Sequence, residues 1–240
     1  MSDTPHLSVV LPCYNESGNI PLIYQRFREV LQGRTDVEVL LVNNGSTDDS
    51  AAVFSAQQAL PENAFARVVT VVENKGYGFG ILSGLREGRG EVLGWTHADM
   101  QTDPEDVLKA LDAWKKESAD GSPVLVRGRR RSRGLFDTFF TWGMGVIATV
   151  ALRTPLHDVN AQPKIFPRDF FASWDDPPDD FSLDLYCLVL ADRQGIKVVE
   201  QNVFFADRMH GEAKGGGTLK GKWKLIKRTF AYIMALRRRI

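Results

Sequence analysis

The chain has little cysteine and no excess of either charge. Its two cysteines, Cys13 and Cys187, have neither the spacing of a metal knuckle nor that of a disulfide framework, which fits a reducing compartment. The 30 basic and 30 acidic side chains balance. A formal net charge of zero argues against a protein that binds nucleic acid, so we expect no nucleic-acid partner.

Long hydrophobic runs are also missing. The longest one, residues 142–152, is too short to cross a bilayer, and no charged segment followed by an apolar one opens the chain. We therefore expect a cytoplasmic protein that is not integral to a membrane.

Strand and helix signals alternate along the first half of the chain. Its 240 residues, 43% of them hydrophobic, suffice for one domain with a sizeable core. Short β-rich runs occur at residues 7–11, 37–42, 68–72, 92–96 and 124–126, with helical patterns between them, such as that of residues 20–31. Continuously apolar strands predict an α/β fold with a mostly parallel central sheet and helices on both faces. Ligands of such sheets bind beyond the carboxyl ends of the strands.

The second half has a different pattern. A helix is expected over about residues 135–149, followed by a stretch rich in Pro and Asp up to residue 180 and an apolar helix over residues 182–194. No repeat or linker separates the halves, so we expect both to belong to one domain.

Three polar clusters each follow a predicted strand. Asn15 and Glu16 come after Pro12, which is expected to stop the first strand, and they either face a ligand or cap the next helix. Residues 43–49 offer amides and carboxylates to a ribose or a base, or form a tight turn with a helix cap. The glycine-rich residues 74–80 let a backbone approach a ligand, and a helix start there favours an anion. They lack the position and spacing of a dinucleotide-cofactor motif, so NAD is not expected.

Asp99 lies in a short turn between an apolar strand and a helix. A carboxylate there, with His97 and Gln101 two residues to either side, suits a divalent cation bound against a diphosphate. The same turn, with Pro104 and several acids after it, also suits an ordinary helix start.

In this order and spacing, the clusters resemble the inverting glycosyltransferases of family 2, which have the GT-A fold, and most closely the dolichyl- and polyprenyl-phosphate sugar synthases. Residues 9–16 resemble the family's opening strand and donor-base loop, residues 43–48 its Asp-Asp-Gly-Ser-x-Asp turn, and residues 74–78 its glycine-rich helix start. The resemblance covers about residues 7–215. We expect a GT-A domain over residues 1–217 and a basic amphipathic helix over residues 218–240.

The resemblance implies a site for a nucleoside-diphosphate sugar and a divalent cation, Mn²⁺ or Mg²⁺. Asp99 and Gln101 match the family's Asp-x-Asp-x-Gln, and His97 replaces the first acid of that motif. Imidazole should weaken magnesium binding more than that of a softer metal. Asn43 and Asn44 replace a second acid pair, which makes the site less acidic. The residues predicted to bind the donor are Pro12, Tyr14, Asn15, Glu16, Asn43, Asn44, Lys75, Gly76, His97, Ala98, Asp99, Gln101, Arg129 and Lys164, with Asp99, Gln101 and His97 as the metal ligands.

Family resemblance also marks residues on the acceptor side. The basic run of residues 127–133 is either a solvated loop or places Arg129 or Arg130 against an anion. Asp158, six residues before Lys164, is implied to lie by the acceptor, although a surface turn pinned by Pro163 is the alternative. Asp184 is implied to act as a base toward a hydroxyl acceptor, or is simply a carboxylate at a helix start.

A later segment resembles the family's Arg-x-x-Gly-x-Ser-Lys loop. Arg208 and Lys214 carry its two cations, Ala213 replaces its Ser, and glycines follow. Such a loop suits a lid that closes over a diphosphate and neutralises its charge, whereas a basic linker is the alternative reading.

The acceptor is predicted to be a polyprenyl phosphate, with a saccharide hydroxyl as the alternative. A phosphate acceptor is already ionised, whereas a hydroxyl needs a carboxylate base, Asp184 or Asp158. The segment of residues 218–240 has an apolar stripe among many Lys and Arg, which either lies on the inner face of a membrane or packs on the domain. A catalytically impaired nucleotide-sugar binding protein is the third possibility, suggested by His97, Asn43 and Asn44.

Overall fold

A seven-stranded sheet organises the protein. The structure, a computed structural model, describes residues 5–130, 149–205, 227 and 230–237. The strands of the sheet are β1 (Leu7–Cys13), β2 (Val37–Asn44), β3 (Ala66–Val71), β4 (Val92–Trp95), β5 (Val124–Arg130), β6 (Lys164–Pro167) and β7 (Lys197–Val203). The helices are α1 (Ile20–Leu31), α2 (Ser50–Gln58), α3 (Tyr77–Glu87), α4 (Glu105–Glu117), α6 (Arg168–Ala172) and α7 (Leu183–Arg193), with a 3₁₀ turn η1 (Pro61–Asn63).

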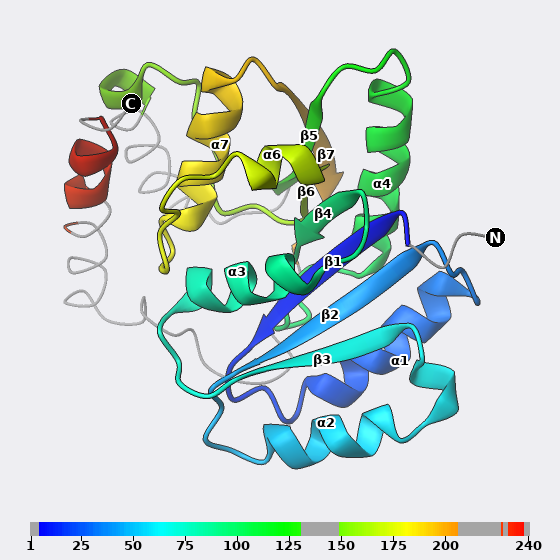
Figure 1. The fold of residues 1–240 in the computed structure, drawn as a ribbon. Coiled ribbons are helices and arrows are strands. Elements are labelled where there is room, and N and C mark those ends of the chain that lie inside the picture. The colour runs from blue at the N-terminus through cyan, green and yellow to red at the C-terminus, as the bar shows by residue number, and fades with distance from the viewer. Residues whose placement is uncertain (1–4, 131–148, 206–226, 228–229, 238–240) are drawn as a thin grey trace.

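The strand order is β3-β2-β1-β4-β6-β5-β7. β1 to β4 pair in parallel, β5 pairs in parallel with β7, and only β6 runs antiparallel to its neighbours, β4 and β5. The mostly parallel sheet predicted from the sequence is confirmed. Because β1, β2, β3 and β4 run the same way, their carboxyl ends meet at one edge of the sheet (Figure 1).

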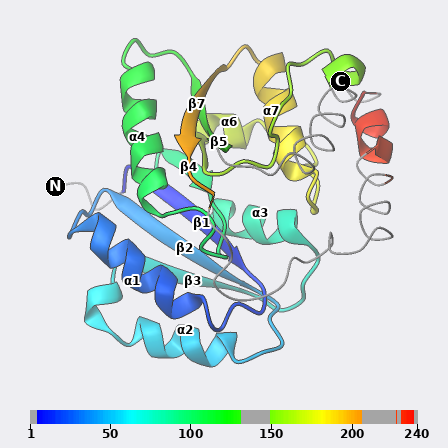
Figure 2. The same cartoon turned by 180° about the vertical axis from the view of Figure 1, so that it is seen from behind.

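Side chains of successive strand residues point to opposite faces of the sheet, and both faces are buried. Val10, Leu40 and Trp95 pack with α3, α6 and α7, which we call the α3 layer. Val9, Leu41 and Val126 pack with α1, α2 and α4, the α1 layer. Figures 1 and 2 show these layers from opposite sides. Helices on both faces were expected, and the continuously apolar strands are the reason.

Two strands were not foreseen. β6 and the short helix α6 lie in the stretch rich in Pro and Asp, and β7 follows α7. β7 is a partly exposed edge strand, and β6 is four residues long and begins with a lysine. The first strand also continues through Pro12 to Cys13, two residues beyond the run of residues 7–11 that was expected to end before the proline.

The helix expected over residues 135–149 lies almost entirely outside the described residues, but residues 149–152 are helical. Of the predicted C-terminal helix, residue 227 and residues 230–237 are described and helical. Ile233 and Leu236 are buried in the α3 layer, which is the packing expected if the stripe lies on the domain, whereas Phe230 is half exposed. Contact with a membrane stays a prediction.

In the described part of the chain, no helix combines the length and the apolar character that a membrane crossing requires.

Helix α3 approaches the sheet closely at Gly84. A Cβ atom added there would contact Cγ1 of Val10 and lie 2.8 Å from Cγ2 of Val42, both in buried side chains of the sheet. The methyl groups of these two short, branched side chains cannot move aside easily. The absence of a side chain at residue 84 therefore sets how near α3 lies to β1 and β2.

We predict that Gly84→Ala lowers the free energy of unfolding by about 1–2 kcal/mol, because overpacking outweighs the gain of about 1 kcal/mol in helix propensity. Urea unfolding measures the change. Ser55→Ala on the exposed face of α2 is the control, since it gains propensity without a close contact. A Gly84→Ala protein as stable as the parent would contradict the close approach.

Asp106 in the first turn of α4 is a buried carboxylate. Burial raises its pKa from 3.8 to about 6, although Lys109, 3.9 Å away, opposes the shift. The folded protein therefore binds the proton of the Asp106 carboxyl group more tightly than the unfolded chain does. The stability that comes from binding this proton is lost as the pH rises from about 4 through about 6.

Asp106→Asn should therefore stabilise the protein at pH 7.5, by on the order of 2 kcal/mol, and have little effect at pH 3.5. Urea unfolding at both pH values tests this. Asp112→Asn, on the exposed side of the same helix, is the matched control. An Asp106→Asn effect of the same size at both pH values would rule out burial of the charge as its cause.

Candidate active site

The loops after β1 and β2 are joined through Asn15. Its backbone N–H donates to Ser46 Oγ at 3.1 Å, and its side-chain Oδ1 accepts from the Thr47 backbone at 2.8 Å. The Glu16 backbone likewise donates to Ser50 Oγ at 3.2 Å. The amide of Asn15 therefore shapes the loop in which the donor contacts of Pro12, Tyr14, Asn15 and Glu16 are predicted to lie.

The two asparagines that end β2 make different contacts. Asn43 Oδ1 accepts from the Ser46 backbone N–H at 3.2 Å, which closes the turn after the strand. Asn44 Nδ2 donates to the Gly76 carbonyl at 3.0 Å and so ties β2 to the start of α3. An aspartate at residue 44 has no proton to donate to that carbonyl. This bond is a physical reason for an amide at residue 44, where the resemblance implies an acid.

The glycine-rich start of α3 is occupied by the chain's own backbone. Gly76 has φ 135°, and a Cβ atom there would clash with the Asp179 carbonyl. At Gly78 a Cβ atom would lie 2.5 Å from the Pro178 carbonyl. The Asp179 carbonyl accepts from the Phe79 N–H at 2.9 Å. These glycines therefore admit a neighbouring loop, residues 178–180, where the sequence suggested a ligand.

The turn after β4 presents the predicted metal ligands. Asp99 is almost fully buried, and its Oδ1 accepts from the Gln101 N–H at 3.2 Å, with Met100 between them at φ 58°. Burial lowers the pKa of His97, against the attraction of Asp99 and Asp184, so its imidazole is neutral near pH 7. Neutral imidazole is the form that binds a metal.

These residues fit a cation shared with a diphosphate better than one enclosed by the protein. The carboxylate oxygens of Asp99 and the amide oxygen of Gln101 suit Mn²⁺ or Mg²⁺, whereas the imidazole nitrogen of His97 favours the softer of the two, Mn²⁺. Ala98 lies buried between His97 and Asp99. Within the described residues, no group of three or more His, Cys, Asp or Glu side chains is arranged to hold a metal ion. The remaining ligands would have to come from a bound diphosphate and water.

Asp158, which is predicted to lie by the acceptor, is held by Arg130. The Arg130 backbone N–H donates to Asp158 Oδ2 at 3.0 Å, and Nε and Nη2 of the guanidinium donate to Oδ1 at 2.9 and 2.5 Å. Both side chains are largely buried. Arg129 is 58% exposed and pairs with Glu200 at 3.1 Å. Of the two arginines considered from the sequence, Arg130 is buried against Asp158, whereas Arg129 is largely exposed and pairs with Glu200.

Lys164 and Asp184 form a fully buried ion pair. The Lys164 ammonium also donates to the carbonyls of Val159 at 2.8 Å and Ala161 at 3.1 Å. Asp184 Oδ1 accepts a second hydrogen bond, from Gln162 Nε2 at 2.7 Å, and Gln162 Nε2 lies 3.3 Å from the Tyr77 hydroxyl. The pair pins residues 159–162 against α7 and links them to the start of α3.

Residues predicted to bind the donor and residues predicted to lie by the acceptor share one electrostatic environment around His97. After burial, the influences on the pKa of His97 are the charges of Asp99 and Asp184, which raise it, and those of Arg130 and Lys164, which lower it. Gln162 and Tyr77 were missed as members of this network. Gln162 lies inside a segment that the resemblance marked, but a polar residue in a loop gave no signal of its own. Arg208 and Lys214 lie outside the described residues.

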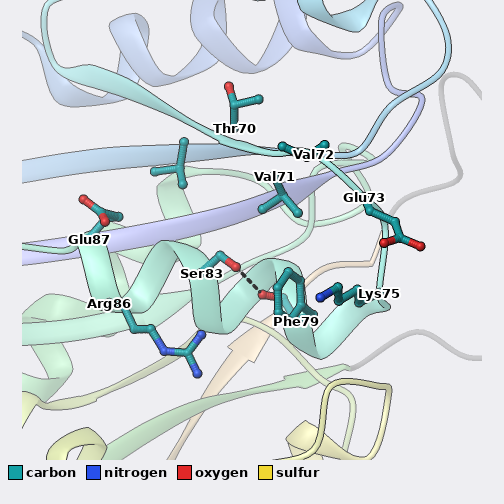
Figure 3. A pocket seen from close by; sticks show the side chains of 10 residues that line it. Thr70, Val71, Val72, Glu73, Lys75, Phe79, Ser83, Arg86 and Glu87 are labelled. Atoms are coloured by element: carbon teal, nitrogen blue, oxygen red, sulfur yellow. Dashed lines mark hydrogen bonds between the residues drawn. The ribbon is translucent and has the colours of Figure 1, made fainter.

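A separate groove of about 510 Å³ lies between the edge strand β3 and α3 (Figure 3). Val69, Val71 and Phe79 line it, and Lys75 lies 5.3 Å above the Phe79 ring. Of the residues predicted to bind the donor, Lys75 is the one that lines this groove in the described part of the chain. The groove is therefore distinct from the turn that carries Asp99.

Comparison with known proteins adds to this geometry. The profile of glycosyl transferase family 2 matches residues 8–171. An uncharacterised glycosyltransferase, YkcC of Bacillus subtilis, is 30% identical over 141 residues, which are 58% of this chain and 41% of that protein. An undecaprenyl-phosphate 4-deoxy-4-formamido-L-arabinose transferase of Pseudomonas paraeruginosa is 27% identical over 217 residues, 87% of this chain and 60% of the relative. The chain thus spans between two fifths and about three fifths of the length of these two relatives.

Among solved structures, glucosyl-3-phosphoglycerate synthase from Mycobacterium tuberculosis, in complex with Mn²⁺, uridine diphosphate and glucosyl-3-phosphoglycerate, has a TM-score of 0.72 and 20% sequence identity. The match covers 97% of this chain and 80% of that one. At this identity the likeness establishes the fold.

The buried ion pair yields a prediction on stability. Lys164→Met or Asp184→Leu alone leaves one charge buried and unpaired, so each should cost about 3–5 kcal/mol, whereas the double variant should be more stable than either single one. Chemical denaturation measures all four proteins. The exposed pair of Lys197 and Glu117 serves as the control cycle, with an expected coupling below about 1 kcal/mol. Additive costs at 164 and 184 would refute the coupling.

Proposed function

Because the chain belongs to glycosyl transferase family 2 and has the GT-A fold, it is an enzyme of the glycosyltransferase type, and we propose that it is an inverting transferase that moves a sugar from a nucleoside diphosphate to a polyprenyl phosphate. The donor is proposed to lie along the carboxyl ends of the parallel strands β1, β2 and β4, which Asn15, Asn43 and Asp99 follow or end. The acceptor is proposed to lie toward Asp158 and Arg130.

The choice of acceptor rests on the hydrogen bonds and the burial of the two carboxylates that could act as a base, Asp158 and Asp184. Asp158 takes three hydrogen bonds from Arg130, and Asp184 is buried against Lys164 and Gln162. A general base must reach the proton that it removes, whereas the oxygens of both carboxylates already accept hydrogen bonds from side chains of the protein. A phosphate acceptor is already ionised and needs no base, so engaged carboxylates suit it better than a saccharide hydroxyl.

The proposed reaction follows from these parts. An oxygen of the acceptor phosphate attacks the anomeric carbon on the face opposite the nucleoside diphosphate. The bond between the anomeric carbon and the diphosphate oxygen breaks, the nucleoside diphosphate leaves, and the configuration of the anomeric carbon inverts. A divalent cation held by His97, Asp99 and Gln101, with manganese preferred, would offset the charge of the diphosphate. Asp158 orients Arg130 toward the incoming phosphate. Arg208 and Lys214 are proposed to neutralise the departing group.

The names of several relatives support a lipid acceptor. They specify undecaprenyl phosphate, and these proteins are 25–27% identical to this chain. A prenyl phosphate lies in a membrane, so the proposed enzyme works at a bilayer surface, on its inner face. Residues 218–240 are the proposed contact, with their many Lys and Arg toward anionic headgroups.

Calorimetric titration with UDP and with GDP, each with Mn²⁺, Mg²⁺ or chelator, tests the donor site. We expect one nucleotide to bind with Mn²⁺, and Asp99→Asn to weaken that binding at least tenfold, or about 1.4 kcal/mol. Asp103→Asn, in the same turn but half exposed, is the matched control and should bind normally. If neither nucleotide binds under any condition, the donor site as proposed is wrong.

Transfer assays with a radiolabelled nucleotide sugar then distinguish the acceptors. Label in the organic phase with polyprenyl phosphate supports the proposal, whereas label on a saccharide selects the hydroxyl alternative. Nucleotide binding without transfer to any acceptor would indicate an impaired enzyme, and recovery of transfer in His97→Asp would identify the replaced acid as the cause.

A further inference from the structure

Strand β3 forms one edge of the sheet. It stands at the end of the strand order, and within the described residues it pairs with β2 alone (Figure 1). The Val39 N–H donates to the Phe65 carbonyl. Because the backbone groups of successive strand residues point alternately to either side, those of Val68 and Thr70 point out of the sheet, away from β2.

This edge is also apolar. Natural edge strands commonly carry lysine, proline or a bulge, which keeps a further strand from pairing with them. Residues 68–72 instead read Val-Val-Thr-Val-Val, and Val72 is 98% exposed. Val69 and Val71 line the groove between β3 and α3, whereas the Thr70 side chain points away from that helix (Figure 3). The edge therefore offers backbone hydrogen-bonding groups and apolar side chains at the same place.

The edge is complementary to itself in the reverse direction. Residues 67–73 read Arg-Val-Val-Thr-Val-Val-Glu, so Thr70 stands between two valine pairs with a charge of opposite sign at either end. Antiparallel pairing of two copies about Thr70 sets Arg67 opposite Glu73 and each valine opposite a valine, and both kinds of cross-strand pair stabilise a sheet. An axis one residue earlier or later would set Arg67 or Glu73 opposite a valine. Arg67 pairs with Glu38 of its own chain at 3.0 Å and stays 39% exposed, so Glu73 of a second copy would join that pair.

The other charges around the groove fit the same symmetry. Glu73 and Lys75 lie at one end of the groove, and Arg86 and Glu87 lie at the other (Figure 3). A two-fold axis brings each end of the groove to the opposite end of the groove of a second copy. Each end then offers one acid and one base to the base and the acid of the other copy.

We propose that β3 is the interface of a homodimer, in which the β3 strands of two copies pair in antiparallel fashion about Thr70 and join the two sheets. Val69 of one copy then faces Val71 of the other, beside both α3 helices, and apolar surface of both is covered. The partner is a second copy of this chain, because the reversed complementarity of residues 67–73 matches a strand of the same sequence. The carboxyl ends of the two sets of strands point in opposite directions, so each copy keeps its own candidate site.

Sedimentation of the full chain with charges placed at residue 70 tests the interface. The parent protein should form a dimer at about 10 μM. Thr70→Lys and Thr70→Glu each set two like charges opposite each other at the axis, so each should raise the dissociation constant of the dimer at least tenfold. An equimolar mixture of the two variants sets opposite charges there and should recover the dimer. Ser55→Lys, at an exposed residue of α2, is the matched control and should dimerise like the parent.

The mixture makes the test specific for pairing about Thr70. Recovery of the dimer in the mixture supports the proposal, because it requires residue 70 of one copy to face residue 70 of the other. A parent protein that stays monomeric up to about 100 μM would overturn it. A dimer that Thr70→Lys leaves intact would also overturn it, since its interface would lie elsewhere. Loss of the dimer in both variants without recovery in the mixture would refute the pairing about Thr70.

Discussion

The buried pair of Lys164 and Asp184 is the interaction on which the site depends. Two charges removed from water persist only when they compensate each other and their remaining hydrogen bonds are met. Here the Lys164 ammonium donates hydrogen bonds to the Val159 and Ala161 carbonyls as well as to the Asp184 carboxylate. The carboxylate also accepts a hydrogen bond from Gln162. The first residue of β6 is thereby joined to α7, and the loop before β6 is fixed against α7 and the start of α3.

The first half of the fold could be predicted from the sequence because its strands are buried on both faces. Val9, Val10 and Leu11 belong to an uninterrupted apolar run, and a parallel sheet then follows from the helices between such runs. β7 has no such run, since it lies at the edge of the sheet and combines three valines with four polar residues. β6 begins with Lys164, whose charge is neutralised only by Asp184 in a distant helix. The sequence around Lys164 gives no indication that Asp184 is its partner.

The candidate site was predictable to a similar extent. The spacing of the polar clusters identified the loops after β1, β2 and β4, because loops at one end of a parallel sheet must converge. The contacts within those loops depend on tertiary structure. Asn44 bonds to Gly76, and the glycines of α3 accommodate residues 178–180, which arrive from the far half of the chain. The roles of Asp99, Asp158 and Asp184 toward substrates stay predictions.

The antiparallel strand β6 also bears on the order in which the sheet assembles. β5 is made before β6, yet in the sheet β6 lies between β4 and β5. During synthesis on a ribosome, the sheet of β1 to β4 can therefore form from segments that are near one another in the sequence. β5 cannot join that sheet until β6, which begins at residue 164, has been made. One sheet in the finished protein is thus two units in synthesis, and the strand that unites them also starts with the lysine of the buried pair.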